Sequence, residues 1–537
     1  MPDWLAEAVN PSTAFATVLV DELIRCGLRE AVVAPGSRSA PLAMALHAAA
    51  SAPESALRLH VRIDERSASF LALGLAKASG RPAAVLCTSG TAAAHCHAAV
   101  IEADEACVPL LVLTADRPPE LRGTGANQTI DQVKLYGGAV RWFCEPGVTE
   151  YRTGQVGYWR SVASRAWSLS SGNGVASAGP VHLNVQFRDP LVPDAGSGWP
   201  EPLDGRADGA PWTRAWFLER SPPGATGSLP EVELDWTERG LVLCGDGTAN
   251  PQSLARLAAS AGWPLLAEPS SGARYGAIAV RSYQYLLDSA EFLAAHRPDL
   301  IISAGRPGLS RGQLALLGRA GLTGNGGPAT RHVVLGQPDG RWADPARTAT
   351  DVASSVRLRH GPAAADGGWL DSWRRADAAA SAAADSVLDS DGRLSEPLLA
   401  RDLGAALPGG ALLWVASSMP ARDLDRHLEP RADLRILANR GASGIDGLVS
   451  SAIGAALAHQ RARTGPAVAL LGDLALLHDA PGLMIGPLEP RPDLSVIVVN
   501  NNGGGIFSGL EQAAFPDPFE RVFGTPHDTD FSHVAAR

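Results

Sequence analysis

An acidic residue and an asparagine cluster each follow an apolar run near the end of the sequence. Asp473 comes after the run 467–471, and Asn501, 28 residues later, comes after the run 494–499. Both runs are typical of buried parallel strands, and the segment between them favours a helix. A strand–helix–strand unit brings both carboxyl strand ends to one edge of the sheet. Oxygens of Asp473, Asn501 and the Gly503 carbonyl would there suit Mg²⁺ bound to a diphosphate.

The paired spacing is more informative than the Gly-Asp dipeptide alone. The triplet 245–247 also contains Gly-Asp, but after Asn250 the next asparagine is Asn325, so no pair follows at a comparable distance. We therefore interpret Asp246 as an ordinary loop residue. The alternative to metal binding is a purely structural role, in which Asp473 only ends a strand and the asparagines only form a turn.

A second candidate is Glu65, in the segment 62–66 after an expected strand at 57–63. The polar segment 88–91 follows the next expected strand, 83–87, at the same predicted edge. A carboxyl group with a raised pKa is suited to general acid and base catalysis. Alternatively, Glu65 is a carboxylate stabilised at the start of a helix.

Six further motifs appear in order along the sequence, at residues 35–42, 116–121, 123–128, 418–423, 439–447 and 500–507. Together with the metal pattern they resemble the thiamine-diphosphate enzymes, and among these the 2-succinyl-5-enolpyruvyl-6-hydroxy-3-cyclohexene-1-carboxylate synthases, the MenD family. The resemblance covers both outer thirds of the chain and is weak in the middle. Leu474 stands where thiamine-diphosphate enzymes usually carry the second glycine of Gly-Asp-Gly.

The resemblance implies a transferase of menaquinone biosynthesis. Its members use thiamine diphosphate with Mg²⁺, or with Mn²⁺ in its place, to decarboxylate 2-oxoglutarate and to add the succinyl unit to isochorismate. Glu65 and Asp473 would both contact the cofactor, and in the family they come from different subunits. The resemblance therefore implies a homodimer or homotetramer with the active site between subunits.

The resemblance also implies roles for individual residues. Glu65 would contact the aminopyrimidine of the cofactor, Gln128 would relay or orient a proton, and Ser418 and Arg422 would contact the succinyl unit; these four are the expected catalytic residues. Both substrates are acids, and guanidinium groups bind carboxylates in a bidentate manner. The expected substrate-binding residues are Ser37, Arg38, Arg117, Asn127, Arg311, Arg440, Ile506, Phe507 and Leu510. Besides Glu65, the expected cofactor-binding residues are Ser443, Gly444, Ile445, Gly472, Asp473 and Leu474, and the expected metal ligands are Asp473, Asn501 and Gly503.

Composition excludes several classes of protein. The formal net charge of −10 argues against nucleic-acid binding. A hydrophobic content of 45% and a charged content of 19% are those of a soluble globular protein. No uninterrupted apolar run is long enough to predict a membrane span. The six cysteines form no paired framework, and the first ten residues lack a basic signal-peptide region, so we expect a cytoplasmic protein.

Alternating strand and helix patterns predict an α/β fold with parallel sheets in three domains. The expected boundaries are 1–192 for a pyrimidine-binding domain, 193–360 for a linker and central domain, and 361–537 for a diphosphate- and metal-binding domain. Members of the family usually continue beyond the equivalent of Arg537, so we expect the third domain to lack its usual terminal segment.

Two other functions remain open at this point. The chain could be a different thiamine-diphosphate carboligase, or a non-catalytic or inactive homologue. A pyridoxal-phosphate enzyme is disfavoured, because Lys77 and Lys134 are the only lysines and neither lies at a site-like loop. A metal site at 95–97 is also disfavoured, because neighbouring side chains on a helix point apart.

Overall fold

The computed structural model describes residues 10–172, 176–194, 198–215, 230–320, 330–337, 339–359, 367–462 and 465–535. The chain forms two compact units. Unit 1 comprises residues 1–220, 441–464 and 478–494, and unit 2 comprises 221–440, 465–477 and 495–537. The α/β prediction is confirmed, because the main sheets consist of parallel strands with helices beside them.

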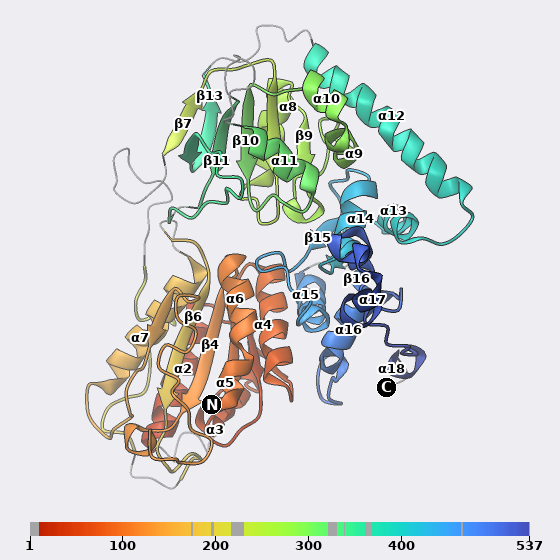
Figure 1. The fold of residues 1–537 in the computed structure, drawn as a ribbon. Coiled ribbons are helices and arrows are strands. Elements are labelled where there is room, and N and C mark those ends of the chain that lie inside the picture. Colours follow the sequence, from red (N-terminus) through yellow and green to blue (C-terminus); the bar gives the residue numbers. More distant parts are fainter. Residues whose placement is uncertain are drawn as a thin grey trace. The chain divides into compact units, whose positions relative to one another are not determined.

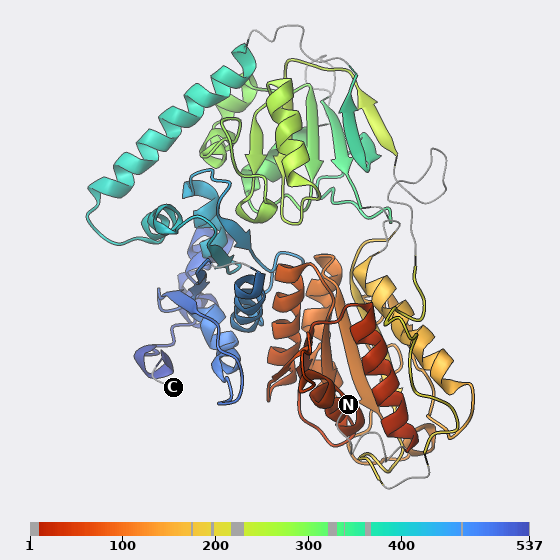
Figure 2. The same cartoon turned by 180° about the vertical axis from the view of Figure 1, so that it is seen from behind.

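Unit 1 is built on a six-stranded sheet with the order β2-β1-β3-β4-β6-β5. Helices cover both of its faces, as Figures 1 and 2 show. One face carries α2 (Pro11–Cys26), α3 (Ala40–Ala50) and α7 (Gln155–Ser171), and the other carries α4 (Glu65–Ser79), α5 (Thr91–His95) and α6 (His97–Glu105). The strands are β1 (Glu30–Val33), β2 (Arg58–Val61), β3 (Ala83–Cys87), β4 (Leu110–Asp116), β5 (Trp142–Cys144) and β6 (Pro180–Gln186).

Local sequence explains where the helices of unit 1 begin and end. The Asn10 side chain caps α2 by accepting a hydrogen bond from the Thr13 amide at 2.9 Å, and Pro11 supplies the fixed φ of a first helical residue. Gly27, with φ 122°, ends that helix. Asp64 caps α4 in the same way, so Glu65 becomes the first residue of a helix at a strand end.

Helix α15 (Leu448–Ala462) packs directly along α4 within unit 1. Two glycines allow this close approach. A Cβ atom at Gly74 would lie 2.0 Å from the Ser451 carbonyl oxygen, and one at Gly454 would lie 2.2 Å from the Leu71 carbonyl oxygen. The backbones therefore meet where no larger side chain fits.

Unit 2 contains two larger parallel sheets and one strand pair. The five-stranded sheet has the order β12-β11-β10-β8-β9, the four-stranded sheet has the order β15-β14-β16-β17, and β7 pairs with β13. The strands are β7 (Glu231–Leu234), β8 (Gly240–Cys244), β9 (Leu265–Ala267), β10 (Leu300–Ala304), β11 (Arg331–Leu335), β12 (Asp351–Ala353), β13 (Ser355–Leu358), β14 (Leu412–Val415), β15 (Arg435–Leu437), β16 (Ala467–Gly472) and β17 (Leu494–Val499).

The helices of unit 2 alternate with these strands along the chain. They are α8 (Pro251–Ala261), α9 (Tyr283–Asp288), α10 (Ala290–Ala295), α11 (Arg311–Arg319), α12 (Gly368–Ser390), α13 (Glu396–Ala406), α14 (Met419–His427), α16 (Asp473–His478), α17 (Pro516–Phe519) and α18 (Ser532–Ala535). As predicted, β16 and β17 are neighbours in one sheet, with α16 between them in sequence. The three-domain boundaries stay a prediction.

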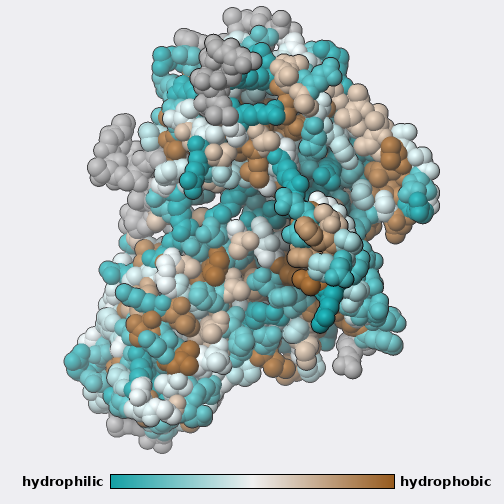
Figure 3. All heavy atoms as spheres, viewed as in Figure 1, coloured by the Kyte–Doolittle hydropathy of each residue, from teal (hydrophilic) through white to brown (hydrophobic). Residues whose placement is uncertain are grey.

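The described helices include none that is long and apolar enough to cross a membrane. Figure 3 shows hydrophilic and hydrophobic side chains interspersed over the visible face. Several large apolar side chains are nevertheless exposed, among them Ile63 at 75%, Leu488 at 95% and Phe515 at 65%.

Candidate active site

The carboxyl edge of the sheet in unit 1 gathers the first set of predicted residues. Ser37 and Arg38 follow β1, Glu65 follows β2, and Arg117 follows β4 directly. Gln128 comes from the loop after Arg117 and has a φ of 54°. Ligands of open α/β sheets bind at this edge, so the position agrees with the sequence prediction.

Arg117 connects three loops at that edge. Its Nη1 donates to the Gln128 carbonyl at 3.0 Å and also contacts the Ser89 hydroxyl. The Gln128 side chain in turn donates from Nε2 to the Ser89 carbonyl at 3.0 Å. Gln128 is therefore held beside the loop after β3, while Asn127 is exposed next to it.

Two guanidinium groups lie close together here. Burial and the nearby positive charge of Arg38 lower the pKa of Arg117. Arg38 donates from Nη1 to the Phe187 carbonyl at 3.0 Å, and its Nε is buried without a hydrogen-bond partner among the described residues. A pair of close cations is suited to an anionic ligand such as a carboxylate.

A buried polar network forms hydrogen bonds to the same loops from the interior of unit 1. Gln132 is fully buried, and its Oε1 accepts from the Gly90 amide at 2.8 Å while its Nε2 donates to Asn184 Oδ1 at 2.8 Å. Asn184 donates to Asp116 Oδ2, and Asp116 Oδ1 accepts from the Arg117 amide at 2.7 Å. Burial raises the pKa of Asp116. Satisfied networks of this kind fix the loops that they support.

Glu65 lies at the start of α4 and is partly exposed. Its carboxylate approaches the end of β3, because its charge contributes to the raised pKa of the Cys87 thiol, after the hydrogen bond with Cys96 and burial. The helix start favours a negative charge at this position. The position therefore accommodates both interpretations of Glu65, as a helix-start carboxylate and as a cofactor contact.

The loop that carries Ser443, Gly444 and Ile445 also belongs to unit 1. The Glu102 carboxylate accepts from the Gly441 amide at 2.9 Å and from the Ala442 amide at 2.7 Å. Ser443 adopts a positive φ of 61°. The carboxylate anchor thus fixes the start of a loop that leaves Ser443, Gly444 and Ile445 only partly buried.

A second set of predicted residues gathers in unit 2 around α14. Ser418 precedes this helix with a φ of 77°, an unusual value for a serine that is typical of functional sites. Arg422, one turn later, donates from Nη1 to the Ser418 carbonyl at 2.9 Å. Burial, followed by the positive charges of Arg440, Arg426 and Arg311, lowers the pKa of Arg422. Three predicted arginines therefore lie within electrostatic reach of one another.

Two of the predicted metal ligands, Asp473 and Gly503, are in contact at the carboxyl ends of β16 and β17. Asp473 is 2% exposed, and its Oδ2 accepts from the Gly503 amide at 2.8 Å. Its Oδ1 accepts from the Leu474 amide at 2.7 Å, and His527 Nε2 lies 3.2 Å from Oδ2. The prediction that β16 and the asparagine loop share one sheet edge is confirmed.

The donor set at this edge fits a hard divalent cation. In the predicted set, Asp473 would supply a carboxylate, Asn501 a carboxamide oxygen and Gly503 a backbone carbonyl. A Cβ atom at Gly503 would lie 2.0 Å from the Gly524 carbonyl oxygen, so only glycine allows this tight loop. Among the described residues, no group of three or more His, Cys, Asp or Glu side chains is arranged to hold a metal ion by itself. A cation here would therefore complete its coordination with ligand phosphate oxygens and water, as Mg²⁺ usually does.

The predicted apolar wall follows the same loop. Ile506 and Phe507 lie in the 3₁₀ turn Gly505–Gly509, and Leu510 follows it; all three are partly buried. The Phe507 ring packs against Phe523 with ring centroids 5.7 Å apart. These side chains are available to an apolar part of a ligand, and the contact of each with substrate stays a prediction.

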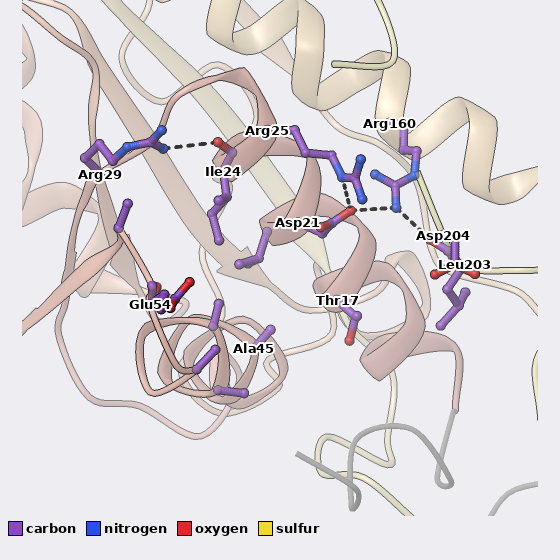
Figure 4. Close-up of a pocket in the computed structure, with 16 residues that line it drawn as sticks. Thr17, Asp21, Ile24, Arg25, Arg29, Ala45, Glu54, Arg160, Leu203 and Asp204 are labelled. Carbon is purple, nitrogen blue, oxygen red and sulfur yellow. Dashed lines mark hydrogen bonds and ion pairs between the residues drawn. The ribbon is translucent and has the colours of Figure 1, made fainter. Parts of the chain in front are cut away.

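A cavity of about 490 Å³ in unit 1 lies away from all of these groups, between α2 and α3. Figure 4 shows that Asp21 bridges Arg25 and Arg160 there, and that Arg29 bonds to the Ile24 carbonyl. Its arginines already have partners, so this cavity takes no part in the candidate site.

Sequence reasoning missed several supporting residues. Gln132 and Ser89 hold the loops of unit 1, and Glu396 and His527 contact Asn501 and Asp473 in unit 2. In the sequence, Glu396 indicates only a helix start, Ser-Glu-Pro. The segment around Ser89 stands out as a polar motif, but nothing in the sequence indicates its pairing with Arg117.

Comparisons with known proteins show the family of this chain. Residues 13–135 match the family described as "Thiamine pyrophosphate enzyme, N-terminal TPP binding domain". Three relatives carry the name 2-succinyl-5-enolpyruvyl-6-hydroxy-3-cyclohexene-1-carboxylate synthase. The one from Thermobifida fusca is 59% identical over 98% of this chain and 91% of its own. Those from Saccharopolyspora erythraea and Kineococcus radiotolerans are 49% and 45% identical, each over 98% of this chain and 90% of its own. The chain therefore belongs to the 2-succinyl-5-enolpyruvyl-6-hydroxy-3-cyclohexene-1-carboxylate synthase family of thiamine-diphosphate enzymes.

Proposed function

We propose that this protein catalyses the reaction for which its relatives are named. CO₂ leaves 2-oxoglutarate, and a carbon–carbon bond forms between the remaining succinyl unit and the ring alkene of isochorismate. The observation that carries this proposal is the gathering of arginines at sheet edges, Arg38 with Arg117 in unit 1 and Arg311, Arg422 and Arg440 in unit 2. A site for substrates with several carboxylates requires such a set.

Thiamine diphosphate, when bound, supplies an electron sink for the negative charge that decarboxylation creates. Glu65 would hold the aminopyrimidine by a carboxyl hydrogen bond, and Ile445 with Ser443 and Gly444 would line the cofactor. Gly472, Asp473 and Leu474 would hold the diphosphate end. The helix start at Asp473 adds backbone amides, which favour an anion there.

The remaining residues would bind and orient the two acids. Arg422 is fixed by its bond to the Ser418 carbonyl, so its other nitrogens can engage a carboxylate of the succinyl unit. Arg117 is fixed in the same way by Gln128 and Ser89. Gln128 would orient a proton near the ring of isochorismate. Pre-ordered guanidinium groups lose little entropy on binding, which favours both affinity and alignment.

The metal is Mg²⁺ in this proposal, with Mn²⁺ as a competent substitute, because the donor set contains only oxygen atoms. The protein acts as a homodimer or homotetramer. Glu65 and Asp473 lie in different units of the chain, and in the family these two cofactor contacts come from different subunits. The six cysteines are free thiols, which suits a cytoplasmic protein.

The test is incubation of the purified protein with 2-oxoglutarate, isochorismate, thiamine diphosphate and Mg²⁺, following the loss of isochorismate absorbance. We expect turnover that requires all four components. Omission of each component in turn provides the control.

Two results would contradict the proposal. Turnover of pyruvate without turnover of 2-oxoglutarate would instead indicate a different carboligase. If calorimetric titration showed no binding of thiamine diphosphate with Mg²⁺, the protein would be a non-catalytic homologue.

A further inference from the structure

The carboxamide of Asn501 is held at its nitrogen end. Asn501 Nδ2 donates to Glu396 Oε1 at 2.9 Å. The same nitrogen lies against Gly505, where a Cβ atom would come within 2.5 Å of it. Because the two ends of a carboxamide point in different directions, a nitrogen that donates to Glu396 leaves the oxygen to face another side, where a cation could bind.

Glu396 is well placed for this contact. It is the first residue of α13, after the capping residue Ser395, whose hydroxyl accepts from the Leu398 amide at 3.4 Å. A carboxylate is favoured at a helix start, and its oxygens can accept a hydrogen bond. Helix α13 also packs on α14, the helix that follows Ser418 and carries Arg422. The acceptor therefore lies on a helix that packs against the helix carrying Arg422.

We propose that Glu396 is a positioning residue for the divalent cation. It accepts the Asn501 amide hydrogen and thereby presents Asn501 Oδ1 to a cation that Asp473 and the Gly503 carbonyl also bind. Without this acceptor the carboxamide could rotate and direct its NH₂ group, which repels a cation, toward the metal. Removing such a supporting hydrogen bond typically weakens metal affinity by about 10- to 100-fold. The inference rests on the proposed function, which supplies the cation.

Two variants separate the position of the acceptor from its charge. Glu396→Asp keeps the charge at the helix start but withdraws the acceptor by one methylene group. Glu396→Gln loses the charge but keeps an acceptor oxygen at the same reach. We expect Glu396→Asp to raise the Kd for Mn²⁺ about 10-fold and Glu396→Gln to change it much less.

The measurement is Mn²⁺ binding by electron paramagnetic resonance, in the presence of saturating thiamine diphosphate. Glu291→Gln is the matched control, since Glu291 is also a glutamate in the first turn of a helix that a serine caps, far along the chain from Asn501. Thermal denaturation checks that each variant is folded. Aspartate is favoured at helix starts, so Glu396→Asp should remain folded.

The three informative outcomes point to different conclusions. An unchanged Mn²⁺ affinity in folded Glu396→Asp would overturn the role of Glu396. The reverse order, with Glu396→Gln the weaker binder, would show that charge rather than the hydrogen bond matters, and would also overturn it. A wild-type protein that binds no Mn²⁺ with thiamine diphosphate would instead overturn the proposed function from which the inference starts.

Discussion

Glu65 and Asp473 are both carboxylates at the start of a helix that follows a strand, but their surroundings differ. Asp473 is 2% exposed and accepts backbone hydrogen bonds on both oxygens, from Leu474 and Gly503. Glu65 is partly exposed and lies near the end of β3. Asp473 is therefore held rigidly, as a metal ligand should be, whereas Glu65 is accessible to a ligand.

This contrast predicts that the two acids can be separated by mutation. Glu65→Gln removes the ionisable carboxyl but keeps its shape, so we expect activity to fall by at least about 100-fold. Binding of thiamine diphosphate with Mg²⁺ should survive largely unchanged in calorimetry, because Asp473 is intact. Glu54→Gln, an exposed glutamate of the same unit, is the control and should behave as wild type. Wild-type turnover by Glu65→Gln would refute the acid role.

Glu268 shows how burial changes an acid that lies outside the site. It is 1% exposed, and its Oε1 accepts from the Gly308 and Leu309 amides at 2.8 Å each. Burial, together with the nearby charge of Asp425, raises the pKa of Glu268 from 4.5 to about 8. The loop that it holds leads directly to Arg311.

The raised pKa predicts a pH dependence of stability with a definite sign. Between its ordinary pKa of 4.5 and about 8, Glu268 is ionised in the unfolded chain but keeps its proton in the folded one. The free energy of unfolding should therefore fall as pH rises through this window, because folding takes up a proton there. Glu268→Gln cannot titrate, so its urea denaturation should depend less on pH between about 5 and 8 than that of the wild type. Equal slopes in both proteins would contradict the assignment.

At the scale of elements, strand and helix positions were the most predictable feature. The expected strand 83–87 agrees with β3, and the apolar runs 467–471 and 494–499 lie in β16 and β17, because short apolar runs between turn signals carry enough local information. The expected strand 57–63 is longer than β2, Arg58–Val61. Asp64 caps α4 there, and the chain must turn before the cap.

Contacts between distant residues could not be predicted from one sequence. Glu396 and Asn501 are separated by 105 positions, and His527 lies 54 positions from Asp473. Nothing in their local patterns indicates either pairing. The common sheet edge of Asp473 and the asparagine loop could be predicted because both follow strands, and neighbouring parallel strands place their ends together. The positions of supporting side chains such as Glu396 and His527 do not follow from strand order, because they depend on tertiary packing.

The close contact between α4 and α15 predicts that an alanine in place of Gly454 destabilises the protein, whereas the same change at a helical glycine outside the contact does not. Gly454→Ala would place a Cβ atom 2.2 Å from the Leu71 carbonyl oxygen, so the helices must move apart. We expect a loss of about 1–3 kcal/mol in the free energy of unfolding. At Gly318, in α11, an added Cβ atom would meet no described atom beyond its own stretch of helix within 4 Å. Gly318→Ala should therefore be neutral or stabilise by up to about 1 kcal/mol, since alanine favours helices.

Chemical denaturation of both variants tests this pair of expectations. If Gly454→Ala were as stable as the wild type, the close packing of α4 on α15 would be wrong. Gly318→Ala controls for the intrinsic effect of replacing a helical glycine with alanine. The comparison thus isolates the steric effect of the added methyl group.

At the scale of the whole molecule, the predicted cofactor contacts are divided between the two units. Glu65 and the loop 443–445 belong to unit 1, whereas Asp473 and Asn501 belong to unit 2. A shared site between subunits predicts that two inactive variants can restore each other's activity. In a mixed dimer of Glu65→Gln and Asp473→Ala chains, one site would carry both defects. The other would combine a native Glu65 with a native Asp473.

Mixing the two variants under conditions of subunit exchange should therefore recover activity. Random pairing makes about half of the dimers mixed, and one of their two sites is intact, so we expect about one quarter of the wild-type activity. Each variant alone, treated identically, should stay inactive. Native mass spectrometry would verify that mixed dimers form. If mixed dimers formed without activity, each site would have to lie within a single chain, because every chain in the mixture carries one defect.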